Sequence, residues 1–136
     1  MKVIIAGGRD FNDYEKLKKA IAQSGWDITE VVSGGAKGAD SLGERWASDN
    51  GVPVKKFPAK WNDLTQAGSV IKTNKWKKKY NANAGFFRNE EMAVYADALI
   101  AMEGGNGTAD MTKRAKKHKL QIHTYEMEDV DYDYKF

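Results

Sequence analysis

Three glycine-rich turns, each directly after an apolar stretch, are the segments of this sequence best suited to chemistry. They are AGGRDF near the N-terminus, SGGAKGAD from Ser33 to Asp40, and EGGNGTAD from Glu103 to Asp110. Glycine has no Cβ, so backbone amides in such turns approach a ligand closely and adopt positive φ. A helix that begins after the turn adds unpaired amides and the positive end of its dipole. These features predict an anion site, most naturally for phosphate.

The turns lie within an alternation of strand and helix patterns. Apolar runs predict strands at 2–6, 30–33, 52–57, 97–102 and 120–125, and amphipathic patterns predict helices at 13–24, 40–50, 85–95 and 109–119. The alternation predicts one Rossmann-like α/β domain with a mostly parallel five-stranded sheet, helices on both faces and strand order 3-2-1-4-5. In such sheets ligands bind at the carboxyl ends of the strands, where the order reverses. All three turns are expected at that edge.

Five motifs occur in order along the chain. They are GGRDF, VVSGGAKGADSLGERWA, PAKW, AGFFRNEEM and GGNGTADM, and together they extend from Lys2 to about His123. In this combination the sequence resembles the SLOG superfamily, and more closely its small YspA/YpsA-like branch. The resemblance implies a Rossmann-like fold that binds a nucleotide or a nucleotide-derived ligand. Relatives in that superfamily include DNA-processing proteins that bind single strands, sensor domains of antiphage systems and Lonely-guy phosphoribohydrolases.

The resemblance also implies which residues bind the ligand. They come from the three glycine turns and from the start of the third predicted helix. The implied residues are Gly7, Gly8, Arg9, Ser33, Gly34, Gly35, Lys37, Gly38, Asp40, Arg88, Asn89, Gly104, Gly105, Gly107 and Thr108.

The chemistry of these side chains agrees with several of those roles. A guanidinium at Arg9, beside a tight turn, suits a bidentate phosphate clamp. Asp40 suits either a helix cap or a ribose contact, and Thr108 suits both a cap and a phosphate contact. Arg88 stands among apolar residues, although a surface salt bridge is its alternative role. Trp61 suits either stacking on a base or packing in the core.

Catalysis is an open alternative. Lonely-guy enzymes carry PGGxGTxxE, and here Glu103 takes the proline position and Met111 the glutamate position. Since a thioether cannot accept a proton, cleavage by that mechanism is not expected. Asp40 and Glu90 remain the catalytic candidates for a nucleotide N-glycosidase-type hydrolase. The histidines, His118 and His123, are expected to be structural or solvent-facing, and neither a metal site nor a cofactor is expected.

A basic insertion at about 62–84 departs from the family pattern. It carries lysines interleaved with aromatic residues between Lys72 and Tyr80. This pattern suits single-stranded nucleic acid, a lid over a phosphorylated ligand, or a solvated loop. The domain is expected at 1–125, followed by an acidic tail at 126–136. That tail is expected to be disordered, to fold back onto the lysines, or to contact a neighbouring subunit of a homo-oligomer.

Composition narrows the function without fixing it. The chain of 136 residues suits one domain, and its formal net charge of +3 permits a polyanionic partner without requiring one. It has no cysteine, and its apolar runs are too short for a signal peptide or a membrane span. A cytoplasmic protein without a membrane partner is expected. The leading hypothesis is a sensor or sequestering protein for a nucleotide-derived ligand.

Overall fold

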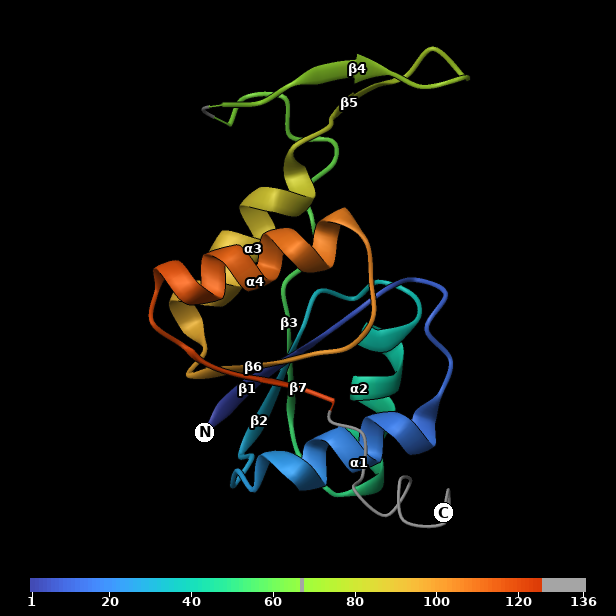
Figure 1. Cartoon of the computed structure of the whole chain (residues 1–136). Helices are drawn as coiled ribbons and strands as arrows, with labels where there is room; N and C mark the ends of the chain where they lie inside the picture. Colours follow the sequence, from blue (N-terminus) through green and yellow to red (C-terminus); the bar gives the residue numbers. More distant parts are fainter. Residues whose placement is uncertain (67, 126–136) are drawn as a thin grey trace, which may run out of the picture.

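Continuous apolar stretches form the central strands of the sheet in the computed structural model, which describes residues 1–66 and 68–125 (Figure 1). The strands of this sheet are β1 (Lys2–Ala6), β2 (Glu30–Ser33), β3 (Val54–Lys56), β6 (Ala98–Ala101) and β7 (Gln121–Thr124). Their order is β3-β2-β1-β6-β7, and every neighbouring pair is parallel. The predicted strand order is therefore confirmed. The predicted acidic tail, 126–136, lies outside the described residues.

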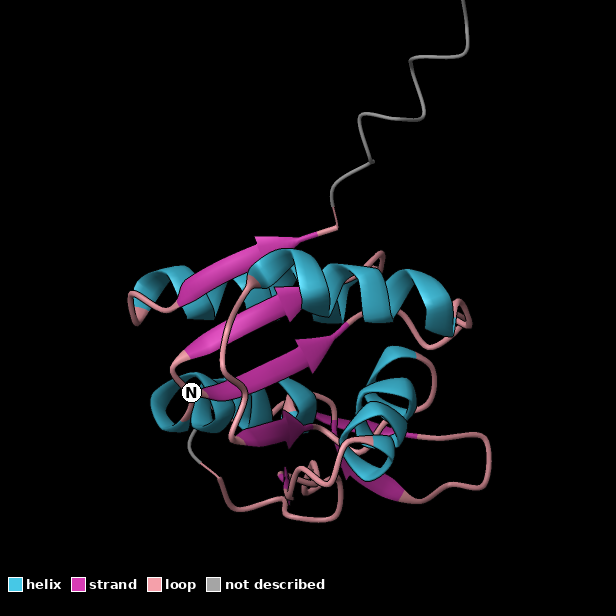
Figure 2. Cartoon of the chain, turned by 90° about the horizontal axis from the view of Figure 1, so that it is seen from below, coloured by secondary structure: helices cyan, strands magenta, loops and turns pink. Residues whose placement is uncertain are grey.

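Helices cover both faces of the sheet (Figure 2). They are α1 (Tyr14–Ser24), α2 (Ala39–Asp49), α3 (Ala84–Tyr95) and α4 (Asn106–Lys117). Successive side chains of a strand point to opposite faces, so β1 supplies both halves of the core. Val3 and Ile5 lie in a buried cluster with α1 and α2, whereas Ile4 and Ala6 lie in one with α3 and α4. The structure thus confirms the predicted Rossmann-like α/β fold class.

The helix starts differ in how they are capped. Asp13 caps α1, because its carboxylate accepts a 3.0 Å hydrogen bond from the amide of Lys16. Gly38 precedes α2 and Gly105 precedes α4, and neither makes a side-chain capping bond. The capping roles considered for Asp40 and Thr108 are therefore wrong. Helix α4 also begins three residues earlier than predicted, since the glycine-containing segment after Gly105 already has helical backbone.

The basic insertion forms a small antiparallel hairpin rather than a loop without regular structure. Its strands are β4 (Ile71–Thr73) and β5 (Lys79–Asn81), and they pair only with each other among the described residues. In Figure 1 the hairpin extends beyond α3, away from the parallel sheet. Strands of three residues are too short to show a period in the sequence, so the pattern gave no sign of them. Across residues 1–66 and 68–125, no helix has the length and apolarity to cross a bilayer.

Candidate functional site

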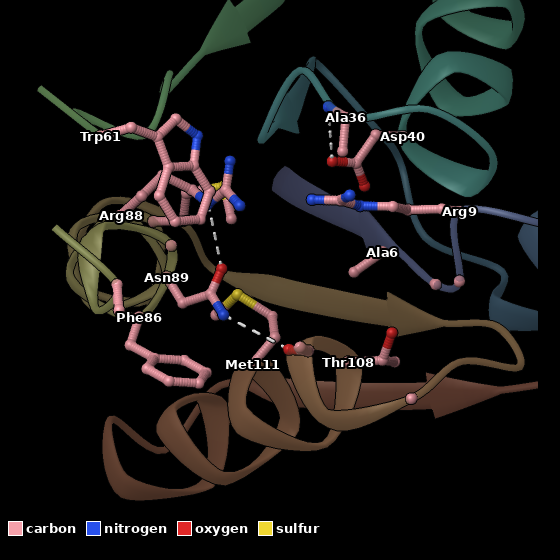
Figure 3. A pocket seen from close by; sticks show the side chains of 17 residues that line it. Ala6, Arg9, Ala36, Asp40, Trp61, Phe86, Arg88, Asn89, Thr108 and Met111 are labelled. Atoms are coloured by element: carbon pink, nitrogen blue, oxygen red, sulfur yellow. Dashed lines mark hydrogen bonds between the residues drawn. The ribbon is translucent and has the colours of Figure 1, made fainter. Parts of the chain in front are cut away.

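A pocket of about 400 Å³ opens beyond the carboxyl ends of β1 and β6 (Figure 3). The strand order reverses between β1 and β6. Helices α1 and α2 pack on one face of the sheet, and helices α3 and α4 pack on the other. The pocket is lined by Ala6, Gly7, Gly8, Arg9, Ala36, Asp40, Trp61, Ala82, Gly85, Phe86, Arg88, Asn89, Met92, Gly105, Gly107, Thr108 and Met111. The three glycine turns thus meet at one site.

The implied binding residues divide into two groups. Those that line the pocket are Gly7, Gly8, Arg9, Asp40, Arg88, Asn89, Gly105, Gly107 and Thr108. Those that do not are Ser33, Gly34, Gly35, Lys37, Gly38 and Gly104. The second group comes almost entirely from the turn after β2, whose residues mainly build the wall behind the pocket.

Contacts between the turns explain why several of these positions are glycine. The amide of Gly8 donates a 2.7 Å hydrogen bond to the carbonyl oxygen of Glu103, and the amide of Ala39 donates a 3.2 Å bond to the carbonyl oxygen of Gly8. Gly38 has φ +75, and a Cβ there would overlap the carbonyl oxygen of Gly8. A Cβ on Gly104 would overlap the hydroxyl of Thr108 and would come within 2.8 Å of the backbone nitrogen of Gly8. These two glycines therefore serve the packing of one turn on another.

Ser33 and Lys37 also lie outside the pocket. Ser33 is buried, and its hydroxyl donates a 2.7 Å hydrogen bond to Glu44 while accepting one of 3.1 Å from the amide of Gly35. Lys37 is exposed. Ser33 therefore holds the shape of the turn, and Lys37 stands on its outer side.

Arg88 is fixed in the pocket wall by backbone groups from two other segments. Its guanidinium donates a 2.6 Å hydrogen bond to the carbonyl oxygen of Gly34 and a longer one, 3.4 Å, to that of Phe57. Burial lowers the pKa of Arg88 from its usual value, Asp40 opposes this effect, and the charge of Arg9 adds to it. Two like charges therefore lie near each other in this pocket.

Arg9 differs from Arg88 because it is exposed and makes no ion pair with a carboxylate of residues 1–66 and 68–125. In Figure 3 its side chain extends from the end of β1 toward Arg88. Its guanidinium is thus available to a ligand. The pocket thus holds two guanidinium groups, that of Arg88, which is fixed by hydrogen bonds, and that of Arg9, which extends toward it.

Asp40 is the only carboxylate among the lining residues. It is 9% exposed and accepts a 3.1 Å hydrogen bond from the amide of Ala36. Burial raises the pKa of Asp40 from its ordinary value of 3.8, while that bond and the charge of Arg88 pull the pKa down. Asp40 thereby holds the turn after β2 and partly balances the charge of Arg88.

Asn89 connects the pocket to the start of α4. It is buried, accepts a 3.2 Å hydrogen bond from Arg88, and donates one of 3.3 Å to the carbonyl oxygen of Gly107. Its amide also donates a 3.0 Å bond to Asp110. The first amides of a helix have no partner within that helix, and Gly107 and Thr108 of α4 line the pocket. Asn89 therefore holds the N-terminal end of α4 beside the pocket.

Two aromatic side chains complete the wall: Trp61, for which stacking on a base or core packing was expected, and Phe86, for which no role was expected from the sequence. Trp61 is 41% exposed and lines the pocket next to Gly85, so the core-packing alternative is wrong. Phe86 lines the same pocket and is 36% exposed. Phe86 could have been found from the sequence, because it is an aromatic residue in the first turn of α3, two positions before Arg88. Met111 is 1% exposed and closes the base of the pocket.

Glu90, the other catalytic candidate, does not line the pocket. Its carboxylate accepts hydrogen bonds from Arg114 and Lys117, and it lies 2.6 Å from the imidazole of His118. The bond with His118 is the main reason that the pKa of Glu90 is lowered. Glu90 and His118 therefore join α3 to α4. His123, at 3.4 Å from Gln23 and edge-on to Trp26, is likewise structural.

The fold and the meeting of three glycine turns define a Rossmann-like α/β protein with its site at the switch point of the sheet. Residues 1–63 match the model of the YspA, cpYpsA-related SLOG family. The matched segment carries β1 to β3 and the first two glycine turns. The resemblance found in the sequence is thereby confirmed.

The fold is also similar to the X-ray structure of DNA processing protein A (DprA) from Streptococcus pneumoniae, with a TM-score of 0.68 and 18% identity. The similarity covers 96% of this chain and 52% of the DprA chain, so this chain spans about half the length of that protein. At such low identity the likeness concerns the fold alone. No curated protein matches the sequence.

Proposed function

We propose that the pocket binds a nucleotide or a nucleotide-derived phosphorylated ligand. The observation that carries this proposal is the pair of arginines, Arg9 and Arg88, which face one pocket whose wall includes the N-terminus of α4. The pair carries two positive charges against the single carboxylate of Asp40. A phosphate between the two guanidinium groups would relieve their repulsion and accept hydrogen bonds from both.

The aromatic side chains favour a nucleotide over a bare phosphate. Trp61 and Phe86 present ring surface to the pocket while remaining partly exposed. An aromatic face stacks on a nucleobase at about 1–3 kcal/mol per base, irrespective of base identity. A volume of about 400 Å³ falls in the range typical of small-molecule sites. A phosphate at the arginines and a base at Trp61 would use both ends of the pocket.

Binding without turnover is the second part of the proposal, which makes the protein a sensor or a sequestering protein. Hydrolysis of an N-glycosidic bond commonly uses two carboxylates, or one carboxylate that is free to act on the sugar. Asp40 is the only carboxylate of the lining set, and its oxygen already accepts from Ala36. Met111 offers no acid or base at the position where the Lonely-guy resemblance would require a glutamate.

A thermal-shift screen with product analysis tests both parts. The pure protein is heated with mononucleotides, dinucleotides, cyclic nucleotides, NAD and ADP-ribose species, and each sample is then analysed for released base. A ligand at about 100 times its Kd adds about 2.7 kcal/mol of stability, which shifts the melting temperature by several degrees. We expect at least one nucleotide to stabilise the protein and to be recovered intact. A melting temperature that no nucleotide changes contradicts the binding proposal, and release of base contradicts the sensor role.

Arg9→Ala and Lys37→Ala form the matched pair for this screen. Both positions are exposed cations in glycine turns, but only Arg9 lines the pocket. We expect the ligand-induced shift to disappear in Arg9→Ala and to persist in Lys37→Ala. Equal loss in both variants would indicate a general charge effect rather than this pocket.

A further inference from the structure

The basic hairpin, defined as residues 71–81, concentrates positive charge in a short segment of the chain. It carries Lys72, Lys75, Lys77, Lys78 and Lys79, and no acidic residue occurs between Asp63 and Glu90. None of these five lysines makes an ion pair with a carboxylate in the part of the chain that the structure describes. Five lysines in so short a segment, with no acidic residue beside them in the sequence, make the hairpin a local source of positive potential.

The tip of the hairpin has an ordered turn. The side-chain oxygen of Asn74 accepts hydrogen bonds of 2.9 Å from the amide of Trp76 and 3.0 Å from the amide of Lys78. The backbone of Asn74 adds two more bonds, accepting from the amide of Lys77 and donating to the carbonyl oxygen of Lys78. Lys77 has φ +60, which turns the chain sharply at the tip. The turn therefore presents its lysines and Trp76 on a fixed backbone.

Trp76 at this tip is not packed into the described part of the protein. It is 72% exposed, and the ammonium of Lys75 lies over its ring, 4.4 Å from the ring centre. A second aromatic residue lies along the strands, where Tyr80 pairs directly across from Lys72. The surface thus places an aromatic residue next to a lysine both at the tip and across the two strands. This is the chemistry of base stacking combined with phosphate attraction.

We propose that the basic hairpin binds single-stranded nucleic acid, with Trp76 stacking on a base and the lysines contacting the backbone phosphates. This surface lies apart from the pocket, because neither Trp76 nor any of the five lysines lines the pocket. A single strand fits better than a duplex, since a stacked base must be free to leave its neighbours. A membrane surface fits less well, because the exposed apolar residues Val70 and Ile71 lie at the base of the hairpin rather than at its tip.

The test is fluorescence anisotropy with a labelled single-stranded oligonucleotide of about 16 nucleotides, titrated with the full chain at salt concentrations from about 50 to 200 mM. We expect binding that weakens steeply with salt. The double variant Lys75→Gln/Lys78→Gln should reduce the salt slope by about 1.4, since each single-strand phosphate contact contributes about 0.7. Trp76→Ala should weaken binding by about 10-fold or more while leaving the slope unchanged.

The matched control is Lys113→Gln/Lys116→Gln, which removes the same charge from the exposed side of α4. This control should bind the oligonucleotide as the unaltered protein does. Failure to bind at about 50 mM salt, or equal loss in the control, would overturn the proposal. So would binding that vanishes in Arg9→Ala but survives in the hairpin variants, because it would place the strand in the pocket. Binding to vesicles rich in phosphatidylserine, with no binding to oligonucleotide, would also overturn it in favour of a membrane.

The outcome is separable from that of the pocket proposal. The hairpin variants should keep the thermal shift caused by a small nucleotide, because the pocket is unchanged. Conversely, Arg9→Ala should keep the binding of the oligonucleotide. Each proposal can therefore fail while the other stands.

Discussion

The guanidinium of Arg88 donates a 2.6 Å hydrogen bond to the carbonyl oxygen of Gly34, which lies 54 residues earlier in the chain. The bond ties α3 to the turn after β2, and a Cβ on Gly34 would come within 2.6 Å of that guanidinium. Arg88 therefore has a structural role in addition to its position in the pocket. Arg9 is exposed, and its side chain donates no such hydrogen bond within residues 1–66 and 68–125.

This difference predicts that the two arginines respond differently to truncation. Arg88→Ala should lower the free energy of unfolding by about 1–3 kcal/mol, because the carbonyl of Gly34 loses a charged donor and Asp40 loses its nearest balancing cation. Arg9→Ala should change it by less than about 0.5 kcal/mol, as is usual at exposed positions. Urea denaturation of the protein without ligand measures both values. A large loss in Arg9→Ala would contradict the description of Arg9 as a free cation.

Two glycines of the turn after β2 distinguish the cost of a left-handed backbone from the cost of steric overlap by an added Cβ. Gly35 has φ +74 with open space around a Cβ, whereas Gly38 has φ +75 and a Cβ there would overlap the carbonyl oxygens of Gly8 and Arg9. Gly35→Ala should cost about 1–2 kcal/mol, the penalty of the left-handed backbone alone. Gly38→Ala should cost clearly more, because two turns must also separate. Equal denaturation midpoints for the two variants would show that the turns do not pack as tightly as described.

Asp40 and Glu90 should influence the pH dependence of stability with opposite signs. The folded-state pKa of Asp40 is raised above 3.8, so the folded chain binds that proton more tightly than the unfolded chain. The Asp40 carboxyl therefore lowers stability above its folded pKa, and this cost disappears as pH falls through that pKa toward 3.8. The pKa of Glu90 is lowered from 4.5, so its contribution stabilises above 4.5 and is lost as pH falls through the folded pKa.

Asp40→Asn and Glu90→Gln test these signs. At neutral pH, Asp40→Asn should be at least as stable as the unaltered protein, since the amide avoids burying a charge while still accepting from Ala36. Glu90→Gln should be less stable, because the amide loses its charged partners on α4. Both differences should shrink toward acid pH. Urea denaturation across a pH series checks this, and an Asp40→Asn variant that is much less stable at neutral pH would reverse the sign assigned to Asp40.

The sequence was sufficient for the fold because the pattern of the central strands is unambiguous. β1 and β6 are continuous apolar runs that are buried on both faces, and each is followed by a glycine turn. Such runs, alternating with amphipathic helices, are typical of a parallel sheet. The hairpin escaped prediction because β4 and β5 have three residues each and are mostly exposed, so neither burial nor period left a pattern.

The site was predictable only in part, because the sequence cannot tell which neighbour a glycine makes room for. Gly8 and Gly38 look alike in their turns, yet Gly8 lines the pocket and Gly38 accommodates the backbone of the adjacent turn. Glu90 was a reasonable candidate from its position beside Arg88 and Asn89. One residue along a helix rotates a side chain by about 100°, and this turns Glu90 away from the pocket toward His118.

The last prediction concerns Trp61 and Trp76, two exposed tryptophans that the two proposals assign to two different ligands. Trp61 lines the pocket and is 41% exposed, whereas Trp76 is 72% exposed at the tip of the basic hairpin. Trp61→Ala should weaken binding of a small nucleotide by about 10-fold or more, the effect of losing one stacked base, and should leave oligonucleotide binding unchanged. Trp76→Ala should do the reverse.

Isothermal titration with the small nucleotide and anisotropy with the oligonucleotide, run on both variants, measure the two effects. Each variant serves as the control for the other, since each removes one partly exposed indole from the same molecule. If Trp61→Ala weakens both ligands equally, the pocket and the hairpin form one continuous surface that a longer strand occupies. That result would replace two independent sites with one. The structure offers a link for this outcome, since the carbonyl oxygen of Trp61 accepts a 2.7 Å hydrogen bond from the amide of Asn81 in β5.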